Sequence, residues 1–487
     1  MSKELTTSIH SPVADSKPVR SGKRKKLNKV EKPIPSHPIA TAIEKFLRRA
    51  RDFESAVTIH VPLSVERKRD LFKELVSKIE DGFKFLNGSS TTETAVLTKI
   101  LDSARRIDRL QKSNVPDMLR ISIFLGLFSA YDAFTGDLLR AIYSKRPELL
   151  NKLTQTVTVS SLLQFSSFED LRSSILEEEI DRFRRASYIE QFSELHKSFD
   201  IPLKDFNRWA NFVECSQRRN ILTHNDGIVN AQYLKICGHE GYAQNPMPLV
   251  GERLDLDMSY LIGACELLME VSLKLAQTLW RKLFPDEIDS ANNHLNQVIY
   301  EDCLMVENWK MAIVFGEFAV SQKKSTDQYR KLFTINNAIG LKFSGKQGEA
   351  EKLLSSVDWS GSSSDFKLAI AVLNDDFGKA TELMTRIGIS GDMINEHAYY
   401  QFPVFREFRK SDEFRSAFEN VFGKPFTDVL QEQASKEQAI AKEEIEKQDK
   451  LVDASDIKES DTTNELGKPR KSSNPNRGRT STRRIKD

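Results

Sequence analysis

Apolar residues recur at three- and four-residue spacing along most of the chain between its two ends. This is the period of an α-helix, whereas a half-buried strand would alternate at every second residue. The helices predicted from the spacing span, in chain order, residues 39–53, 64–85, 92–111, 117–143, 167–177, 179–198, 203–223 and 254–284. Only residues 156–160 alternate as a strand would. The pattern therefore predicts an all-α protein.

The predicted helices differ in how they would pack. The helix over 117–143 is apolar around most of its circumference, which favours a place at the centre of a helical bundle. Beyond residue 285 the helical units become shorter. Two similar stretches begin at Gly345-Lys346 and Gly378-Lys379, thirty-three residues apart. This spacing is close to that of helical-hairpin repeats such as TPR, but two weak copies favour an ordinary helical domain, with a TPR-like array as the alternative.

Charge is distributed in blocks, although the net charge is only +2. Residues 1–37 carry +6, residues 431–466 carry −6 and residues 467–487 carry +7. Both ends are poor in apolar residues, so we expect them to be disordered, with a frayed helix over 431–450. The predicted organisation is a basic tail (1–37), an N-terminal helical segment (38–113), a central bundle (114–285), a C-terminal helical domain (286–430) and a charged tail (431–487).

The chain offers little evidence for a membrane protein, a secreted protein or a metalloprotein. We find no uncharged apolar run near the roughly 20 residues that a membrane span needs. The four cysteines lie far apart without metal-binding spacing. We therefore expect a cytoplasmic protein with reduced core thiols, no membrane association, no bound metal and no cofactor.

One short segment carries candidate chemistry, because Arg219, Asn220 and His224 fall within two turns of the helix predicted over 203–223 and its end. A guanidinium can bind phosphate oxygens in a bidentate manner, and an imidazole can transfer a proton near neutral pH. Asparagine can orient either group. The set suits RNA cleavage without a metal, in which His224 activates a ribose 2′-hydroxyl and Arg219 stabilises the charge on the phosphate.

The same residues also fit an ordinary helix end. In that interpretation Arg218 and Arg219 lie in water, and His224 interacts with the carbonyl groups at the helix C-terminus. An Arg-Asn pair followed by His is only moderately specific. The residues alone leave both interpretations open.

The segment Arg219-Asn-Ile-Leu-Thr-His224 closely resembles the R-N-x-x-x-H motif of the HEPN superfamily. The apolar and aromatic stretch from Phe124 to Phe134, and the long helix after Leu254, are similar to the flanking helices of that family. The resemblance covers residues 115–285. It implies an up-and-down helical bundle, a homodimer whose motifs meet in a cleft, and a metal-independent endoribonuclease, often a toxin or an anti-phage defence effector.

Carried over to this sequence, the resemblance makes Arg219 and His224 the catalytic pair and Asn220 the polar residue of the motif. Asp132 or Asp137 would be an acidic helper on the preceding long helix, with a solvated surface acid as the alternative. Arg218 would contact substrate phosphate, unless it is an ordinary surface arginine. RNA is the expected substrate, and a protein partner is expected for the C-terminal helical domain.

The sequence leaves two other functions open. The first is a non-enzymatic helical interaction protein that binds nucleic acid through its basic tails, because Lys and Arg clusters attract nucleic acid by releasing counterions. The second is a regulatory unit that senses a nucleotide without cutting RNA. The family resemblance favours the endoribonuclease, although a fold alone does not determine function.

Overall fold

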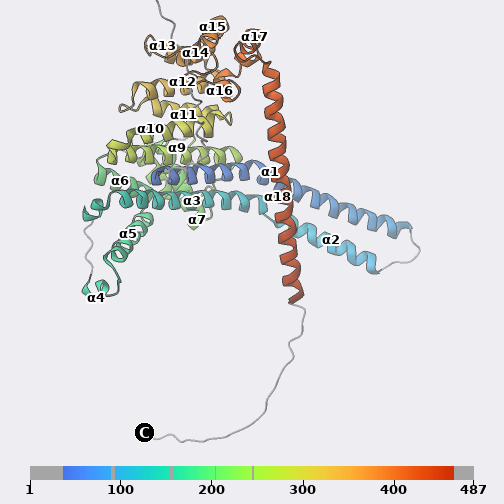
Figure 1. The fold of residues 1–487 in the computed structure, drawn as a ribbon. Helices are drawn as coiled ribbons and strands as arrows, with labels where there is room; N and C mark the ends of the chain where they lie inside the picture. Colours follow the sequence, from blue (N-terminus) through green and yellow to red (C-terminus); the bar gives the residue numbers. More distant parts are fainter. Residues whose placement is uncertain (1–36, 89–93, 153–157, 203, 244–245, 466–487) are drawn as a thin grey trace, which may run out of the picture.

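The computed structural model describes residues 37–88, 94–152, 158–202, 204–243 and 246–465. Within these residues the regular structure is helical and no β-strand occurs, which confirms the all-α class (Figure 1). The α-helices are α1 (Pro38–Gly88), α2 (Thr94–Lys112), α3 (Val115–Lys145), α4 (Val159–Leu162), α5 (Phe168–Arg185), α6 (Tyr188–Phe199), α7 (Trp209–His224), α8 (Ala231–His239), α9 (Met258–Leu283), α10 (Ile288–Ile299), α11 (Trp309–Val320), α12 (Asp327–Phe343), α13 (Gln347–Ser355), α14 (Ser364–Leu373), α15 (Phe377–Ile387), α16 (Glu396–Gln401), α17 (Asp412–Phe422) and α18 (Phe426–Glu465). Of the strand candidate 156–160, residues 156 and 157 lie outside the described residues, and α4 begins at Val159.

The central bundle is built on α1, α3 and α9, which pack against one another. α5 and α7 lie on the side of α3 that faces away from the C-terminal helices (Figure 1). Aromatic side chains fill the centre, and Phe46, Phe128, Tyr131 and Phe212 are almost completely buried. Because each aromatic ring buries a large apolar area, this cluster supplies much of the stabilisation of the bundle. The wide apolar face predicted for 117–143 is explained by the position of α3 between several helices.

The N-terminal half of α1 belongs to this bundle, because Ile43, Phe46 and Leu47 are buried in it. The expected boundary between residues 113 and 114 therefore does not separate two packing units. The two helices predicted over 39–53 and 64–85 are one continuous helix that contains Pro62. Val57 and Val61 lie between the two predicted helices and are buried. Their packing keeps the chain helical at Pro62.

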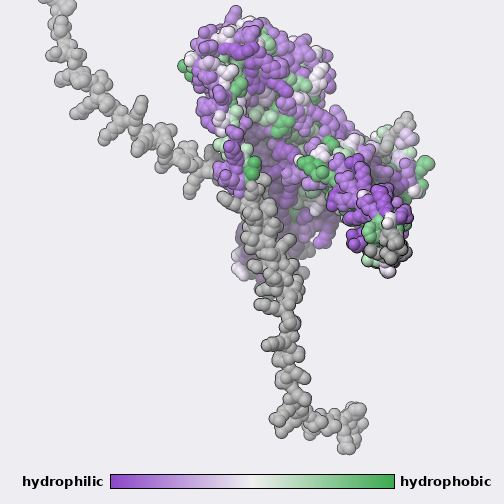
Figure 2. All heavy atoms as spheres, turned by 90° about the vertical axis from the view of Figure 1, so that its right-hand side faces the viewer, coloured by the Kyte–Doolittle hydropathy of each residue, from purple (hydrophilic) through white to green (hydrophobic). Residues whose placement is uncertain are grey.

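The C-terminal half of α1 pairs with α2 and projects from the body as an arm (Figure 1). Figure 2 views the molecule from the side of this arm and shows a surface that is mostly hydrophilic, with scattered hydrophobic patches. Leu101 and Phe83 are among the exposed apolar residues of the arm. The arm thus has only two helical layers and buries less apolar area than the bundle.

Two helix boundaries differ from those predicted near the motif. The break expected at residue 178 occurs at Ala186 and Ser187, where Ser187 and Glu190 form a capping box at the start of α6. α7 begins at Trp209 rather than at residue 203. These local differences matter because the ends of α5, α6 and α7 converge on one cavity.

The C-terminal region is a stack of short antiparallel helices. α12 and α13 form one helical hairpin, and α14 and α15 form the next. The left-handed residue in the turn is Gly345 in the first hairpin and Asp375 in the second. The equivalent positions are thus thirty residues apart, which corrects the expected spacing of thirty-three.

The acidic segment also differs from the prediction, because α18 continues as one helix to Glu465. Phe426 and Val429 anchor its start in the body. From residue 431 to 447 most side chains are exposed, as expected for a charged helix without a core face. The helix expected over 431–450 thus extends to Glu465, and residues 466–487, like 1–36, lie outside the described part of the chain.

Within the described residues, one helical stretch between residues 94 and 145 is long and apolar enough to cross a membrane by length and composition alone. Its apolar side chains in α3, such as Phe124 and Leu127, are buried in the bundle. A central helix of a bundle has this same composition, because it must be apolar on most sides.

Candidate active site

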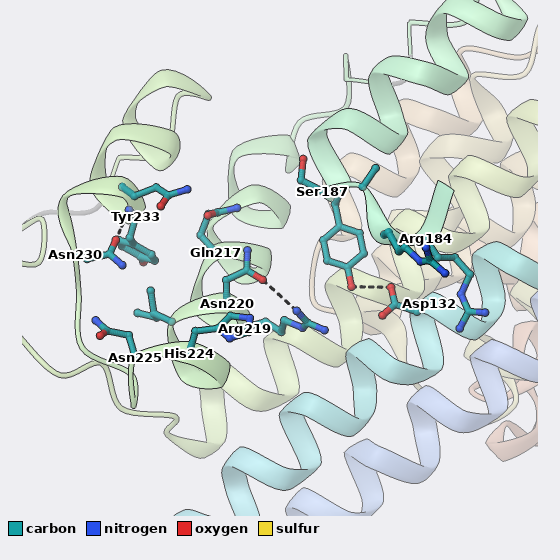
Figure 3. A pocket seen from close by; sticks show the side chains of 15 residues that line it. Asp132, Arg184, Ser187, Gln217, Arg219, Asn220, His224, Asn225, Asn230 and Tyr233 are labelled. Atoms are coloured by element: carbon teal, nitrogen blue, oxygen red, sulfur yellow. Dashed lines mark hydrogen bonds between the residues drawn. The ribbon is translucent and has the colours of Figure 1, made fainter. Parts of the chain in front are cut away.

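A cavity of about 400 Å³ lies where the ends of α5 and α7 and the starts of α6 and α8 converge on α3 (Figure 3). Its size is within the range of ligand pockets, and its walls are mainly polar. The residues that line it are Asp132, Arg184, Arg185, Ala186, Ser187, Tyr188, Gln217, Arg219, Asn220, Ile221, His224, Asn225, Asn230, Gln232 and Tyr233. Arg219, Asn220 and His224 are thus brought into one cavity.

The end of α7 determines where His224 lies. His224 is the last residue of the helix, and Asn225 caps it. Asp226 and Gly227 then adopt left-handed backbone conformations, with φ of 50° and 75°, and such reversals terminate helices. The Gly227 N–H donates to the Ile221 carbonyl over 3.0 Å, which folds the chain back. This turn leaves the His224 imidazole exposed at the mouth of the cavity.

Arg219 is half-buried, and its guanidinium extends toward α3 (Figure 3). Its Nη1 donates to the Asn220 Oδ1 over 3.2 Å. Among the described residues, no carboxylate oxygen lies within ion-pair distance of Arg219. Because Asn220 is neutral, it orients the guanidinium without cancelling its charge, so Arg219 can still bind an anion.

Asp132 reaches the same cavity from α3 and accepts a hydrogen bond of 2.8 Å from the Tyr188 hydroxyl. Burial raises the pKa of the Asp132 carboxyl, while the Tyr188 hydrogen bond and the positive charges of Arg219 and Arg184 oppose that rise. Asp137, the alternative acidic helper, is bound by Lys45 and Arg140 and does not line the cavity. The structure therefore places Asp132, and not Asp137, beside the motif.

Arg218 does not have the phosphate-binding position expected from the resemblance. It is only 6% exposed, and its Nε donates to the Glu214 Oε1 over 2.7 Å. Its guanidinium stacks on the Tyr260 ring at 3.9 Å and also donates to the Asp255 carbonyl. Since a buried charge needs a partner, Arg218 and Glu214 form a structural pair behind the cavity. We correct the expected role of Arg218 accordingly.

Sequence reasoning missed the contributions of Arg184, Arg185 and Tyr188. A helix predicted to begin at residue 179 placed them inside it, where nothing distinguished them from other charged or aromatic residues. The pattern Ser187-x-x-Glu190 is a capping box and could have revealed the helix break that exposes them. The polar lining from α8 and its N-cap, Asn230 and Gln232, had no comparable indication in the sequence.

The cysteines and the acidic side chains show no second reactive centre in the described part of the chain. All four cysteines are unpaired and buried, which confirms the prediction of core thiols. Burial raises the pKa of the Cys215 thiol, so this residue near the motif stays protonated. No group of three His, Cys, Asp or Glu side chains among the described residues is arranged to hold a metal ion.

No family model, curated protein or solved structure matches this chain. What the cavity can do must therefore be judged from its own residues.

Proposed function

We propose that this protein is a metal-independent endoribonuclease of the HEPN type. The observation that carries the proposal is the meeting of Arg219, Asn220, His224 and Asp132 in one cavity, with no carboxylate of the described residues within ion-pair distance of Arg219. An unpaired guanidinium beside an exposed imidazole is what phosphodiester cleavage needs when no metal takes part. A role in toxicity or phage defence is part of the same proposal.

In the proposed reaction His224 takes the proton of a ribose 2′-hydroxyl. The 2′-oxygen attacks the adjacent phosphorus, a new 2′-O–P bond forms, and the bond from phosphorus to the 5′-oxygen breaks. Water at the exposed mouth of the cavity protonates the departing 5′-oxygen. Arg219 stabilises the extra negative charge on the non-bridging oxygens, and the product ends are a 2′,3′-cyclic phosphate and a 5′-hydroxyl.

Asp132 and Asn220 act as positioning residues in this proposal. Asn220 holds one side of the Arg219 guanidinium. Asp132 lies close enough for the positive charge of Arg219 to oppose the rise in its pKa that burial causes, while Tyr188 fixes the orientation of the carboxyl. Together they direct Arg219 toward the cavity without forming the close ion pair that would neutralise it.

A homodimer is also part of the proposal, with the second copy placed at the turn that follows His224. Ile228, Leu249 and Val250 are exposed by 38%, 74% and 62%. Hydrogen bonds between Val229 and residues 251 and 252 hold the two segments together. Clustered exposed apolar side chains beside a polar cavity are typical of protein interfaces.

The decisive experiment compares wild-type protein with the His224→Ala variant on total RNA in EDTA. We expect the variant to cleave at least 100-fold more slowly, because general-base catalysis contributes about 10²–10⁴-fold. The His60→Ala variant, which removes an exposed histidine of α1, is the matched control and should cleave normally. Product ends are identified by their resistance to, or labelling by, end-specific enzymes.

Sedimentation of wild-type protein, His224→Ala and His60→Ala tests the dimer. All three should sediment as a dimer, because neither substitution changes Ile228, Leu249 or Val250. Cleavage by His224→Ala at the wild-type rate would refute the proposed chemistry. If wild-type protein binds RNA but never cuts it, the non-enzymatic interaction protein becomes the better account.

A further inference from the structure

Arg184 lies at the end of the cavity opposite His224 (Figure 3). Arg185, its neighbour in the last turn of α5, also lines the cavity. Other arginines of this helix are neutralised, since Arg182 is bound by Glu179 and Glu194 and Arg172 by Glu169. Arg184 is different, because its nearest carboxylate oxygen, on Asp181, is 3.8 Å away. Its Nε is buried without a hydrogen-bond partner.

Arg185 is exposed, and among the described residues no carboxylate pairs with it. The N-terminus of α6 adjoins it, but the Glu190 carboxylate already occupies that helix end through the Ser187 N–H and hydroxyl. The positive charge at this end of the cavity therefore comes from the two arginine side chains. Arg185 without a carboxylate partner among the described residues, and Arg184 with only the long contact to Asp181, favour a bound anion.

The other end of the cavity carries no charge apart from His224 itself. Asn225, Asn230 and Gln232 line it with amide groups, which suit base edges and ribose hydroxyls. Between the two ends, Arg184 and Arg219 both act electrostatically on the Asp132 carboxyl. The cavity thus has an amide end, a central arginine and an end with two arginines near the Asp132 carboxyl.

We propose that Arg184 and Arg185 bind the phosphate next to the scissile one in a single-stranded RNA, an inference that rests on the proposed function and specifies its substrate. Arg219 serves the scissile phosphate, and the α5 arginines serve its neighbour along the strand. The strand must be unpaired, because a base inside a duplex is stacked and cannot enter a cavity of about 400 Å³. The substrate is therefore an oligonucleotide rather than a single nucleotide.

The test uses His224→Ala protein, which binds without cutting, and adds the double change Arg184→Gln/Arg185→Gln. Glutamine keeps helix propensity close to that of arginine, so α5 should remain folded. Binding is measured for a single-stranded RNA of ten nucleotides and for a dinucleotide that contains one phosphate. We expect at least tenfold weaker binding of the longer RNA and unchanged binding of the dinucleotide.

Salt dependence gives a second measurement. The loss of contact with one phosphate of a single strand should reduce the slope of log K against log salt by about 0.7. The matched control is Arg106→Gln/Arg109→Gln, which removes two exposed arginines from α2 on the arm. This control lowers the net charge equally, and it should change neither the affinity nor the slope by a comparable amount.

Several outcomes would overturn the inference. These are an equal loss in the α2 control, an equal loss for the dinucleotide, unchanged binding of the longer RNA, or a duplex that binds as tightly as the single strand. The proposed function fails separately. If wild-type protein cuts no RNA while the α5 variant still loses affinity, only the catalytic proposal is wrong. If wild-type protein cuts and the α5 variant behaves like it, only this inference is wrong.

Discussion

Arg218 and Arg219 are neighbours in the chain, but one helical step turns their side chains about 100° apart. That rotation directs Arg218 into the interior, where the Glu214 carboxylate also accepts hydrogen bonds from the Tyr233 and Tyr260 hydroxyls. It directs Arg219 into the cavity, where only Asn220 contacts it closely. The same residue type therefore stabilises the fold at one position and remains available to a substrate at the next.

Another buried polar residue, His294, leads to a prediction about pH. Burial and the nearby His37 lower the pKa of His294 to about 4. The Glu44 Oε1 lies 3.5 Å from its Nε2, and burial raises the pKa of that carboxyl. His294 is consequently neutral in the folded protein near neutral pH.

As the pH falls below about 6.5, the unfolded chain binds a proton at His294 that the folded protein cannot bind until about pH 4. The free energy of unfolding should therefore fall by about 2.5 kcal/mol between pH 7 and pH 4.5 on account of this residue. Urea unfolding of wild type and of His294→Gln at pH 7 and pH 4.5 measures this fall in the free energy of unfolding. The variant should lack the part of the fall that is due to His294. The exposed His239→Gln is the control. Equal losses in wild type and His294→Gln would contradict the prediction.

At the scale of elements, the helices α11 and α12 approach each other closely where glycines replace larger residues. A Cβ at Gly316 would lie 2.8 Å from the Asn337 Cβ, and a Cβ at Gly340 would lie 3.1 Å from the Ala312 Cβ. The first distance is shorter than real carbon atoms allow, so a side chain at Gly316 would push the two helices apart. The C-terminal stack depends on this close contact, because α12 also supports α13 and α14.

We predict that Gly316→Ala lowers the free energy of unfolding by about 1–3 kcal/mol, because an added methyl group overpacks the contact between α11 and α12. The control is Gly263→Ala inside α9, where nothing lies within 4 Å of the added Cβ. That change should stabilise the protein by about 0.5–1 kcal/mol through helix propensity. Urea unfolding measures both variants, and destabilisation of the same size at both positions would refute the packing explanation.

At the scale of the whole molecule, one continuous core of buried residues extends from α1 through the bundle and into the C-terminal helices. α9 contacts α1 and α3 on one side and α10 and α11 on the other, which links the two regions. The cavity is lined by residues of α3, α5 and α7, and α5 and α7 lie below α3 in Figure 1. The rigid bundle can therefore hold Asp132, Arg184 and Arg219 at fixed relative positions.

The continuous core predicts how fragments behave. A fragment of residues 114–285, the boundaries expected for the central bundle, lacks α1 and would expose the apolar faces of α3 and α9 that Ile43 and Phe46 cover. We expect it to aggregate or to bind a hydrophobic dye, as chains with large exposed apolar surfaces do. A fragment of residues 37–430 should be soluble and helical by circular dichroism. A folded, monodisperse 114–285 fragment would contradict this expectation.

The sequence by itself determined the helical class, the approximate position of most helices and the grouping of Arg219, Asn220 and His224. These features are local, because periodicity, caps and spacing along one helix act within a few residues. It also indicated Asp132, although only together with Asp137 and through the family resemblance. The HEPN relationship, the RNA substrate and the dimer stay predictions.

Tertiary structure alone decided which residues share the cavity. Tyr188 binds Asp132 across fifty-six positions of the chain, and Arg184 acts electrostatically on the same carboxyl from a third helix. Such contacts depend on how α3, α5 and α6 pack, and no local pattern encodes that packing. Burial likewise removed Arg218 from the candidate site, because the orientation of one helix decides which of two adjacent arginines faces the cavity and which faces the core.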